Sequence, residues 1–166
     1  DTLIEAFSRI SSQLPGWELI LAGGSTDPDY ISRLKKQVKK LPIKIIINPS
    51  LFKIKQLLGS AKIFWSATGF GIDVAHNPEK AEHFGITVVE AMSAGAVPVV
   101  IDAGGHKETV VEAETGFLWN TIDQLNQKTT LLANDPKLWE KLSCATIWRS
   151  KLFSTSAFED KFLKII

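Results

Sequence analysis

The chain has 166 residues, of which 45% are hydrophobic and 22% are charged, and it carries a formal net charge of +1. This composition fits one ordinary globular domain over residues 1–166, with a substantial core. The nearly balanced charge gives no long-range field to recruit nucleic acid, and no apolar run approaches the roughly 20 residues that cross a bilayer. A transmembrane protein and a nucleic-acid-binding protein are therefore not expected.

The one cysteine, Cys144, excludes an internal disulfide and suits a reducing compartment. We therefore expect a cytoplasmic protein. Within the sequence pattern, Cys144 falls in a C-terminal helix, where a small apolar side chain is expected to be buried.

Strand and helix patterns alternate along the first 66 residues. The predicted helices end at Pro or Gly and cover residues 2–14, 27–41 and 50–59. The predicted strands are rich in Ile, Leu and Trp and cover residues 17–22, 43–47 and 62–66. Because such alternation builds parallel βαβ units, we expect an α/β fold, a doubly wound, Rossmann-like parallel sheet with helices on both faces.

Residues 67–81 interrupt this rhythm and have no period, so they are expected to form a long loop. Loops of this length are uncommon and are often functional. From residue 121 onward the pattern is helical, with helices predicted over residues 121–133, 135–151 and 155–165.

Two carboxylates eight residues apart, Glu82 and Glu90, frame the most informative segment of the chain. Phe84 and Gly85 lie between them, and the apolar run that follows is helical and ends at Gly95, directly before a Val-rich strand. A glycine at a helix start lets the backbone approach a ligand closely, and the free N–H groups of the first turn form an anion site. We therefore expect both carboxylates to face one pocket.

This segment resembles the Glu-x7-Glu signature of glycosyltransferase family 4, whose members are retaining, nucleotide-sugar-dependent enzymes with two Rossmann-like domains (the GT-B fold). Downstream, residues 97–100 (VPVV), 104–110 (GGHKETV) and 115–118 (TGFL) match the family's Pro-Val strand, Gly-Gly-x-x-Glu loop and next short strand. Upstream, residues 3–7 and 17–24 are similar to the helix and strand that follow the family's donor-phosphate basic pair. The resemblance implies the C-terminal, donor-binding half of a GT-B glycosyltransferase.

The resemblance also implies roles for individual residues. Glu90 is expected to bind the ribose hydroxyls, and Glu82 is expected to lie beside the donor sugar as the catalytic carboxylate. The N–H groups of Gly85, Ile86 and Thr87 are expected to hold the diphosphate. The other residues expected at the donor site are Gly23, Gly24, Phe84, Gly104 and Gly105.

The chain departs from the family pattern in two respects. The family's donor-phosphate Arg and Lys, and its acceptor-binding N-terminal domain, would precede residue 1. We therefore expect a piece of a longer protein, in which that domain binds the acceptor and the intact protein can associate peripherally with a membrane. The loop over residues 67–81 is also longer than in the family, which leaves the sugar and acceptor selectivity open.

The sequence gives no support for a metal site. His76, His83 and His106 have no Cys or second His at a ligand spacing, and Asp73 and Asp102 stand apart from any Asp-x-Asp pair. No metal and no cofactor are expected, and the nucleotide diphosphate sugar serves as co-substrate.

The resemblance implies that the intact enzyme moves a hexose from a nucleotide diphosphate sugar to an acceptor hydroxyl on a glycan, a lipid-linked sugar or a polysaccharide. Retention is what the family implies, and no general base is recognisable in the chain. Two alternatives stay open. One is a non-catalytic sugar-nucleotide-binding or interaction subunit, and the other is a nucleotide-sugar epimerase on the same fold.

Overall fold

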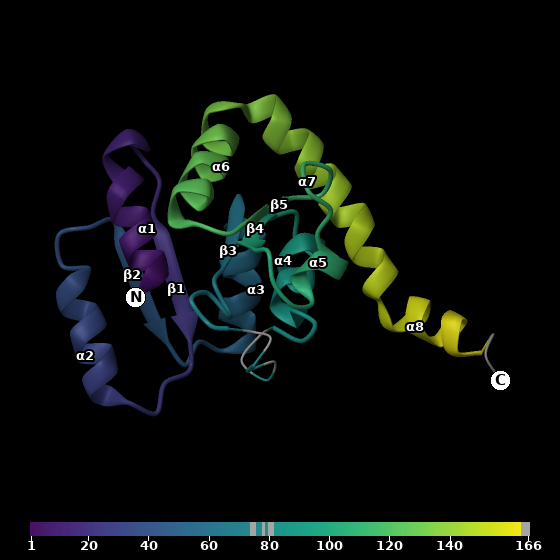
Figure 1. Cartoon of the computed structure of the whole chain (residues 1–166), viewed down its shortest axis with the longest axis horizontal. Helices are drawn as coiled ribbons and strands as arrows, with labels where there is room; N and C mark the ends of the chain where they lie inside the picture. Colours follow the sequence, from purple (N-terminus) through teal and green to yellow (C-terminus); the bar gives the residue numbers. More distant parts are fainter. Residues whose placement is uncertain (74–75, 78, 80–81, 164–166) are drawn as a thin grey trace. The chain divides into compact units, whose positions relative to one another are not determined.

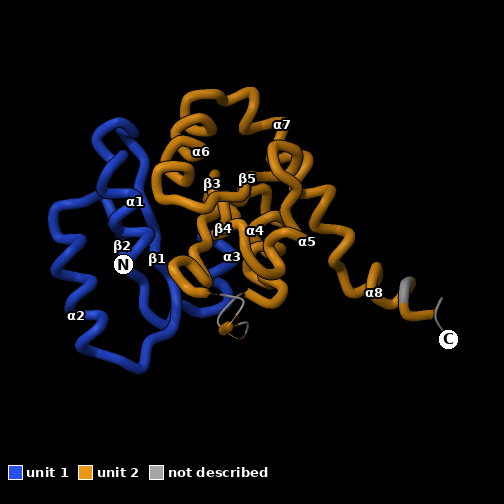
Figure 2. Tube along the Cα trace, viewed as in Figure 1, with its two compact units in different colours: residues 1–57 blue, residues 58–166 orange. Residues whose placement is uncertain are grey.

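The computed structural model describes residues 1–73, 76–77, 79 and 82–163 as short parallel strands and helices (Figure 1). The chain divides into two compact units, residues 1–57 and residues 58–166, which are coloured separately in Figure 2. None of the helices in the described ranges is long and apolar enough to cross a membrane.

The first unit pairs two strands in parallel. Its elements in chain order are α1 (Thr2–Ile10), η1 (Ser11–Gln13), β1 (Leu19–Gly23), α2 (Pro28–Gln37), β2 (Ile43–Ile47) and the first part of α3 (Leu51–Ser60). Leu19 lies opposite Ile43 and Gly23 lies opposite Ile47 in the parallel register. The β1-α2-β2 order is therefore the βαβ unit that the sequence predicts.

Helix α2 begins where the sequence predicts, but it ends earlier than expected. The Asp27 carboxylate accepts the Tyr30 N–H at 2.9 Å, and Pro28 occupies the first turn, where its missing N–H costs nothing. The helix was expected to reach residue 41, but its last residue is Gln37. Pro42 disfavours a helical conformation at the residue before it, so the chain turns before Pro42 to enter β2.

The second unit contains a three-stranded parallel sheet in the order β3-β4-β5. Its elements are β3 (Ile63–Ser66), α4 (Ile86–Ser93), β4 (Val97–Ile101), α5 (His106–Thr109), β5 (Phe117–Trp119), α6 (Ile122–Asn134), α7 (Pro136–Ser150), η3 (Lys151–Phe153) and α8 (Thr155–Phe162). All five residues of the central strand β4 are buried. Helix α4 packs against β3, β4 and α7, and α6 packs against β4 and β5. Part of the core is formed by Val88, Met92, Val100 and Val110.

These observations confirm the α/β class and the parallel pairing of the strands, although the strands form two separate sheets. The predicted helix over 155–165 is described as far as Phe162, and residues 164–166 lie outside the described residues. Five residues of the predicted loop over 67–81 also lie outside them.

The expectation for Cys144 was wrong, because this side chain is exposed on α7. The buried residues of α7 are Leu142, Thr146 and Ser150, which recur every fourth position. Since successive helical residues are rotated by about 100°, Cys144 lies almost opposite this stripe. The residue type of Cys144 suggested burial, but its exposure is decided by the side of the helix on which the residue lies.

Candidate functional site

Helix α4 begins at a tight turn between Glu82 and Gly85. Gly85 has φ +81° and ψ +52°, a left-handed conformation that favours glycine. Its N–H group donates to the Glu82 carboxylate Oε1 at 3.1 Å, so Glu82 fixes the entry into the helix. No side chain caps the helix, and the next two residues, Ile86 and Thr87, are exposed. The first turn of α4 is therefore open to solvent.

The Gly104-Gly105 loop is bonded to the same turn. The Gly105 N–H donates to the Glu82 carbonyl at 2.8 Å. A Cβ atom added to Gly105 would lie 2.3 Å from the His83 carbonyl oxygen and 2.8 Å from Phe84 Cα, so the two backbones touch. The structure thus brings Gly105 to the turn formed by Glu82 and Gly85, which lies 20 residues earlier in the sequence, and all three were predicted at one site.

Glu90 and Phe84 lie at the surface of the second unit. Glu90 is exposed, whereas Glu82 is half-buried. Phe84 is 40% exposed, and its ring contacts the Phe153 ring edge-on, with 5.7 Å between the ring centres. A pocket of about 600 Å³ in this unit is lined by Gly104, but the described residues that line it include neither Glu82 nor Glu90. The shared pocket expected for the two carboxylates stays a prediction.

The Gly23-Gly24 turn belongs to the first unit. Gly23 ends β1, and its carbonyl accepts the Asn48 N–H at 2.9 Å. A Cβ atom added to Gly24 would lie 3.4 Å from Asn48 Oδ1. Both glycines are exposed, so the turn leaves its backbone accessible. Their place at the donor site stays a prediction.

His106 is a residue of this site that sequence reasoning missed. Its side chain is fully buried, and its Nδ1 lies 3.1 Å from the Ile101 carbonyl. Since a carbonyl only accepts, Nδ1 carries the proton, and the buried Nε2 then has no hydrogen-bond partner among the described residues. The Cδ2 atom next to Nε2 lies 3.4 Å from where a Cβ atom of Gly85 would be. The only sequence signal is a histidine directly after Gly-Gly.

Burial lowers the pKa of His106 below its ordinary value of 6.5, because desolvation penalises the charged ring. The hydrogen bond to Ile101 and the charge of Glu82 raise the pKa and offset part of this effect. The ring is thus held neutral behind the α4 turn at neutral pH.

We expect the chain to lose stability as the pH falls below 6.5 because of His106. The unfolded chain then binds a proton that the folded chain resists, whereas above this pH both forms are neutral and the penalty disappears. Urea unfolding at a series of pH values measures how the free energy of unfolding depends on pH. His106→Gln is expected to flatten this dependence of stability on pH. A slope unaffected by His106→Gln would contradict the assignment.

Among the residues that the structure describes, no three His, Cys, Asp or Glu side chains come together as a metal site would require.

Comparison with known proteins identifies relatives over almost the whole chain. Residues 1–147 match the family described as "Glycosyl transferases group 1". The chain is 34% identical over 173 aligned residues to the GDP-Man:Man(3)GlcNAc(2)-PP-Dol alpha-1,2-mannosyltransferase of Dictyostelium discoideum. This alignment covers 99% of the chain and 32% of that relative, so the chain spans about a third of its length.

Two solved structures share the fold. One is Anabaena Alr3699/HepE in complex with UDP-glucose, with a TM-score of 0.78 and 22% identity, over 99% of this chain and 43% of that one. The other is the C-terminal domain of a glycosyl transferase group 1 family protein (LpcC) from Francisella tularensis. It has a TM-score of 0.74 and 23% identity, over 90% of this chain and 76% of that one. Because the family match covers most of the chain, the protein belongs to the group 1 glycosyl transferases.

Proposed function

We propose that the intact protein is a retaining glycosyltransferase that moves a hexose from a nucleotide diphosphate sugar to an acceptor hydroxyl. We further propose that residues 1–166 form its donor-binding domain and that a preceding domain binds the acceptor. The family match over residues 1–147 supports the class of enzyme. The Dictyostelium relative is named for a GDP-Man donor, which makes GDP-mannose the first donor to test.

The open first turn of α4 is the observation that carries this proposal. The first hydrogen bond of the helix runs from the Val89 N–H to the Gly85 carbonyl, so the N–H groups of the three preceding residues have no acceptor within the helix. Together with the helix dipole, these groups attract an anion such as a diphosphate. Because the Gly85 N–H already donates to Glu82, Ile86 and Thr87 offer the open donors. Stabilising the leaving diphosphate is the main requirement of the chemistry.

Glu90 is the proposed ligand of the ribose hydroxyls. It lies one turn into α4 and is exposed, so its carboxylate is accessible to a nucleotide whose phosphates sit at the helix start. A carboxylate accepts two hydroxyl hydrogen bonds at once, which suits the adjacent hydroxyls of a ribose.

We expect Glu90→Ala to weaken binding of GDP to the chain by about tenfold or more, since hydrogen bonds to a charged group are worth about 1.5–3 kcal/mol. The unmodified chain is expected to bind GDP weakly, with a dissociation constant on the order of 1 mM. Titration followed by NMR measures both constants, and UDP and ADP run in parallel identify the base. The control Glu114→Ala removes another exposed carboxylate and should change nothing. An unchanged dissociation constant for Glu90→Ala would remove Glu90 from the ribose site.

Three features of the proposal stay predictions from the sequence: the absence of a metal, the cytoplasmic location and the peripheral membrane association of the intact protein. The alternatives, a binding subunit and an epimerase, would also bind a sugar nucleotide. They differ from a transferase in that no sugar would pass to an acceptor when the intact protein is incubated with GDP-mannose.

A further inference from the structure

A pocket of about 600 Å³ lies where the strands of the second unit end. Its described lining includes Phe70 from the loop after β3, Asp102 and Gly104 from the residues after β4, Lys107 from α5 and Asn120 from the residue after β5. The carboxyl ends of parallel strands are the usual place for a ligand in α/β folds, and this volume is typical of ligand pockets.

Asp102 is the best-placed polar group in the pocket. Its side chain is 31% exposed, its Oδ1 lies 3.3 Å from Lys107 Nζ, and its Oδ2 accepts from Asn120 Nδ2 at 3.3 Å. These contacts hold the carboxylate in one orientation. Since a carboxylate can accept about four hydrogen bonds, Asp102 can still accept hydroxyl groups, and Lys107 can still donate.

The charge of the described lining does not favour an anion. Among the described lining residues, the charged ones are Asp73, Asp102 and Lys107. Asp102 is paired with Lys107, and Asp73 Oδ2 is paired with His76 Nδ1 at 2.6 Å. A diphosphate would find no surplus of positive charge here, in contrast to the open N–H groups at the start of α4. The lining suits a neutral ligand with many hydroxyl groups.

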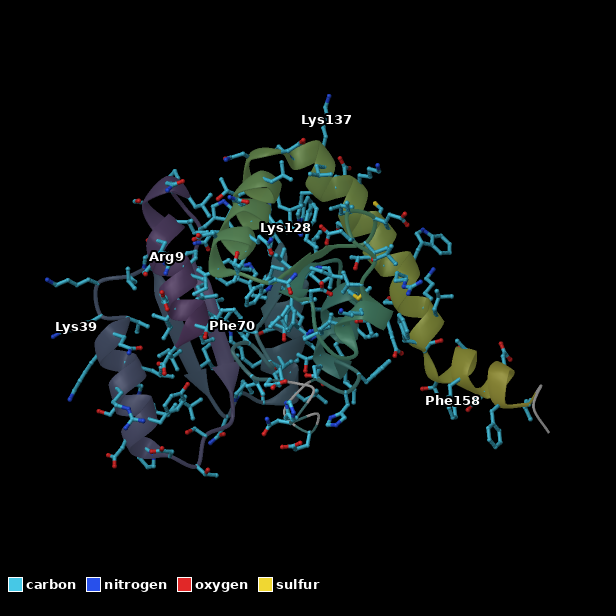
Figure 3. The ribbon with its side chains drawn as sticks, viewed as in Figure 1. Arg9, Lys39, Phe70, Lys128, Lys137 and Phe158 are labelled. Atoms are coloured by element: carbon cyan, nitrogen blue, oxygen red, sulfur yellow. The ribbon has the colours of Figure 1, made fainter. Side chains whose placement is uncertain are left out.

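Phe70, which is labelled in Figure 3, adds an apolar surface to the lining. Its ring packs against the buried Trp119 ring with 5.1 Å between centres. Gly69 and Gly71, on either side, have φ values of +94° and +74°, which let the loop turn tightly around Phe70. Two turn hydrogen bonds, from the Phe70 N–H to the Ala67 carbonyl and from the Ile72 N–H to the Gly69 carbonyl, fix the loop backbone. An aromatic ring beside a carboxylate, an amide and an ammonium group can contact both the apolar and the hydroxyl-bearing parts of a hexose.

We propose that this pocket binds a hexose unit of the acceptor, with Asp102 as the main hydrogen-bond acceptor and Phe70 as the apolar wall. The inference rests on the proposed function and extends it, because it gives the donor-binding half a role in acceptor recognition. Of the residues predicted for the donor, only Gly104 belongs to the described lining, which separates this pocket from the helix start that we assign to the diphosphate.

The test is a backbone-amide NMR titration of the isotopically labelled 166-residue chain with three probes: a mannotriose, GDP and GDP-mannose. Mannotriose is expected to shift the amide signals of residues 69–73, 102–104 and 120. GDP is expected to shift those of residues 86–90 and to leave those of residues 69–73, 102 and 120 unchanged, whereas Gly104 is shared with the predicted donor site. Asp102→Asn is expected to weaken mannotriose binding at least about tenfold, and Lys107→Gln several-fold, since both remove charge-assisted hydrogen bonds. The control Glu114→Gln makes the same carboxylate-to-amide change at an exposed site away from the lining.

The outcomes separate this inference from the proposed function. No mannotriose shift at the pocket, or equal affinity in Asp102→Asn, would overturn the pocket assignment. If GDP-mannose shifts the pocket signals and mannotriose does not, the assignment is also overturned, because the pocket would then bind the hexose of the donor. The GDP signals of residues 86–90 report on the proposed donor site alone. If they shift and mannotriose has no effect, the donor proposal stands and the pocket inference fails.

Discussion

Replacing Gly105 by Ala is expected to lower the free energy of unfolding of the chain by about 2–3 kcal/mol, as overpacking of a closed site does. Gly105 has φ −63° and ψ −13°, a helical conformation open to any residue, so the backbone angles are not the cause. The cause is space, because the added Cβ atom would lie 2.3, 2.7 and 2.8 Å from His83 O, His83 C and Phe84 Cα. All three are backbone atoms, which cannot rotate away. The alanine must push the two backbone segments apart.

Urea unfolding followed by circular dichroism measures this effect. Gly59→Ala is the matched control, because no atom lies within 4 Å of the position of its added Cβ and the residue belongs to helix α3. That change is expected to be neutral or to stabilise by about 0.5–1 kcal/mol. If Gly105→Ala unfolds at the same urea concentration as the unmodified chain, the contact between the two loops is looser than the structure indicates.

A functional consequence follows from the same contact. Gly105 bonds to the Glu82 carbonyl, and the Glu82 carboxylate accepts the Gly85 N–H that begins α4. Displacing Gly105 is therefore expected to move the start of the helix and to weaken GDP binding in addition to stability. The Gly-Gly loop thus supports the predicted donor site through Glu82.

The secondary structure was predictable because local signals decide it. The strand over residues 43–47 matches β2 in full, since an isoleucine-rich run lies between Pro42 and the Asn48-Pro49 turn. Asp135 and Pro136 begin α7 as expected, because the Asp135 carboxylate accepts the Leu138 N–H. The grouping of the strands into two sheets was not predictable, because strand partners depend on residues far apart in the sequence.

The candidate site was predictable only where a motif marks it. The Glu82–Gly85 turn and Gly105 stand in recognisable patterns, and the structure bonds them to each other. His106 gave no such signal, since burial of a single histidine depends on the packing around it. The pocket beside Phe70 gave no signal either, because a loop without a period gives no indication of its path and Asp102 stands in no metal-binding pair.

Glu82→Gln is expected to lower the turnover of the intact enzyme by at least about a hundredfold, the usual scale when an electrostatic contribution to the transition state is removed. Binding of GDP is expected to change little. The motivation is the position of Glu82, which precedes α4 and lies before the N–H groups proposed for the diphosphate. Glutamine keeps the oxygen that accepts the Gly85 N–H at 3.1 Å, so the helix start is preserved while the charge is lost.

This substitution separates a catalytic role of Glu82 from a structural one. A purely structural carboxylate would tolerate glutamine, so turnover would stay close to that of the unmodified enzyme, whereas Glu82→Ala would impair stability and GDP binding. A carboxylate that acts on the transition state would lose turnover and the specificity constant together in Glu82→Gln, with the dissociation constant for GDP unchanged. Steady-state kinetics with GDP-mannose and an acceptor sugar, together with the GDP titration, distinguish the two. A rise in the Michaelis constant alone would make Glu82 a ligand of the ground state and would contradict the catalytic assignment.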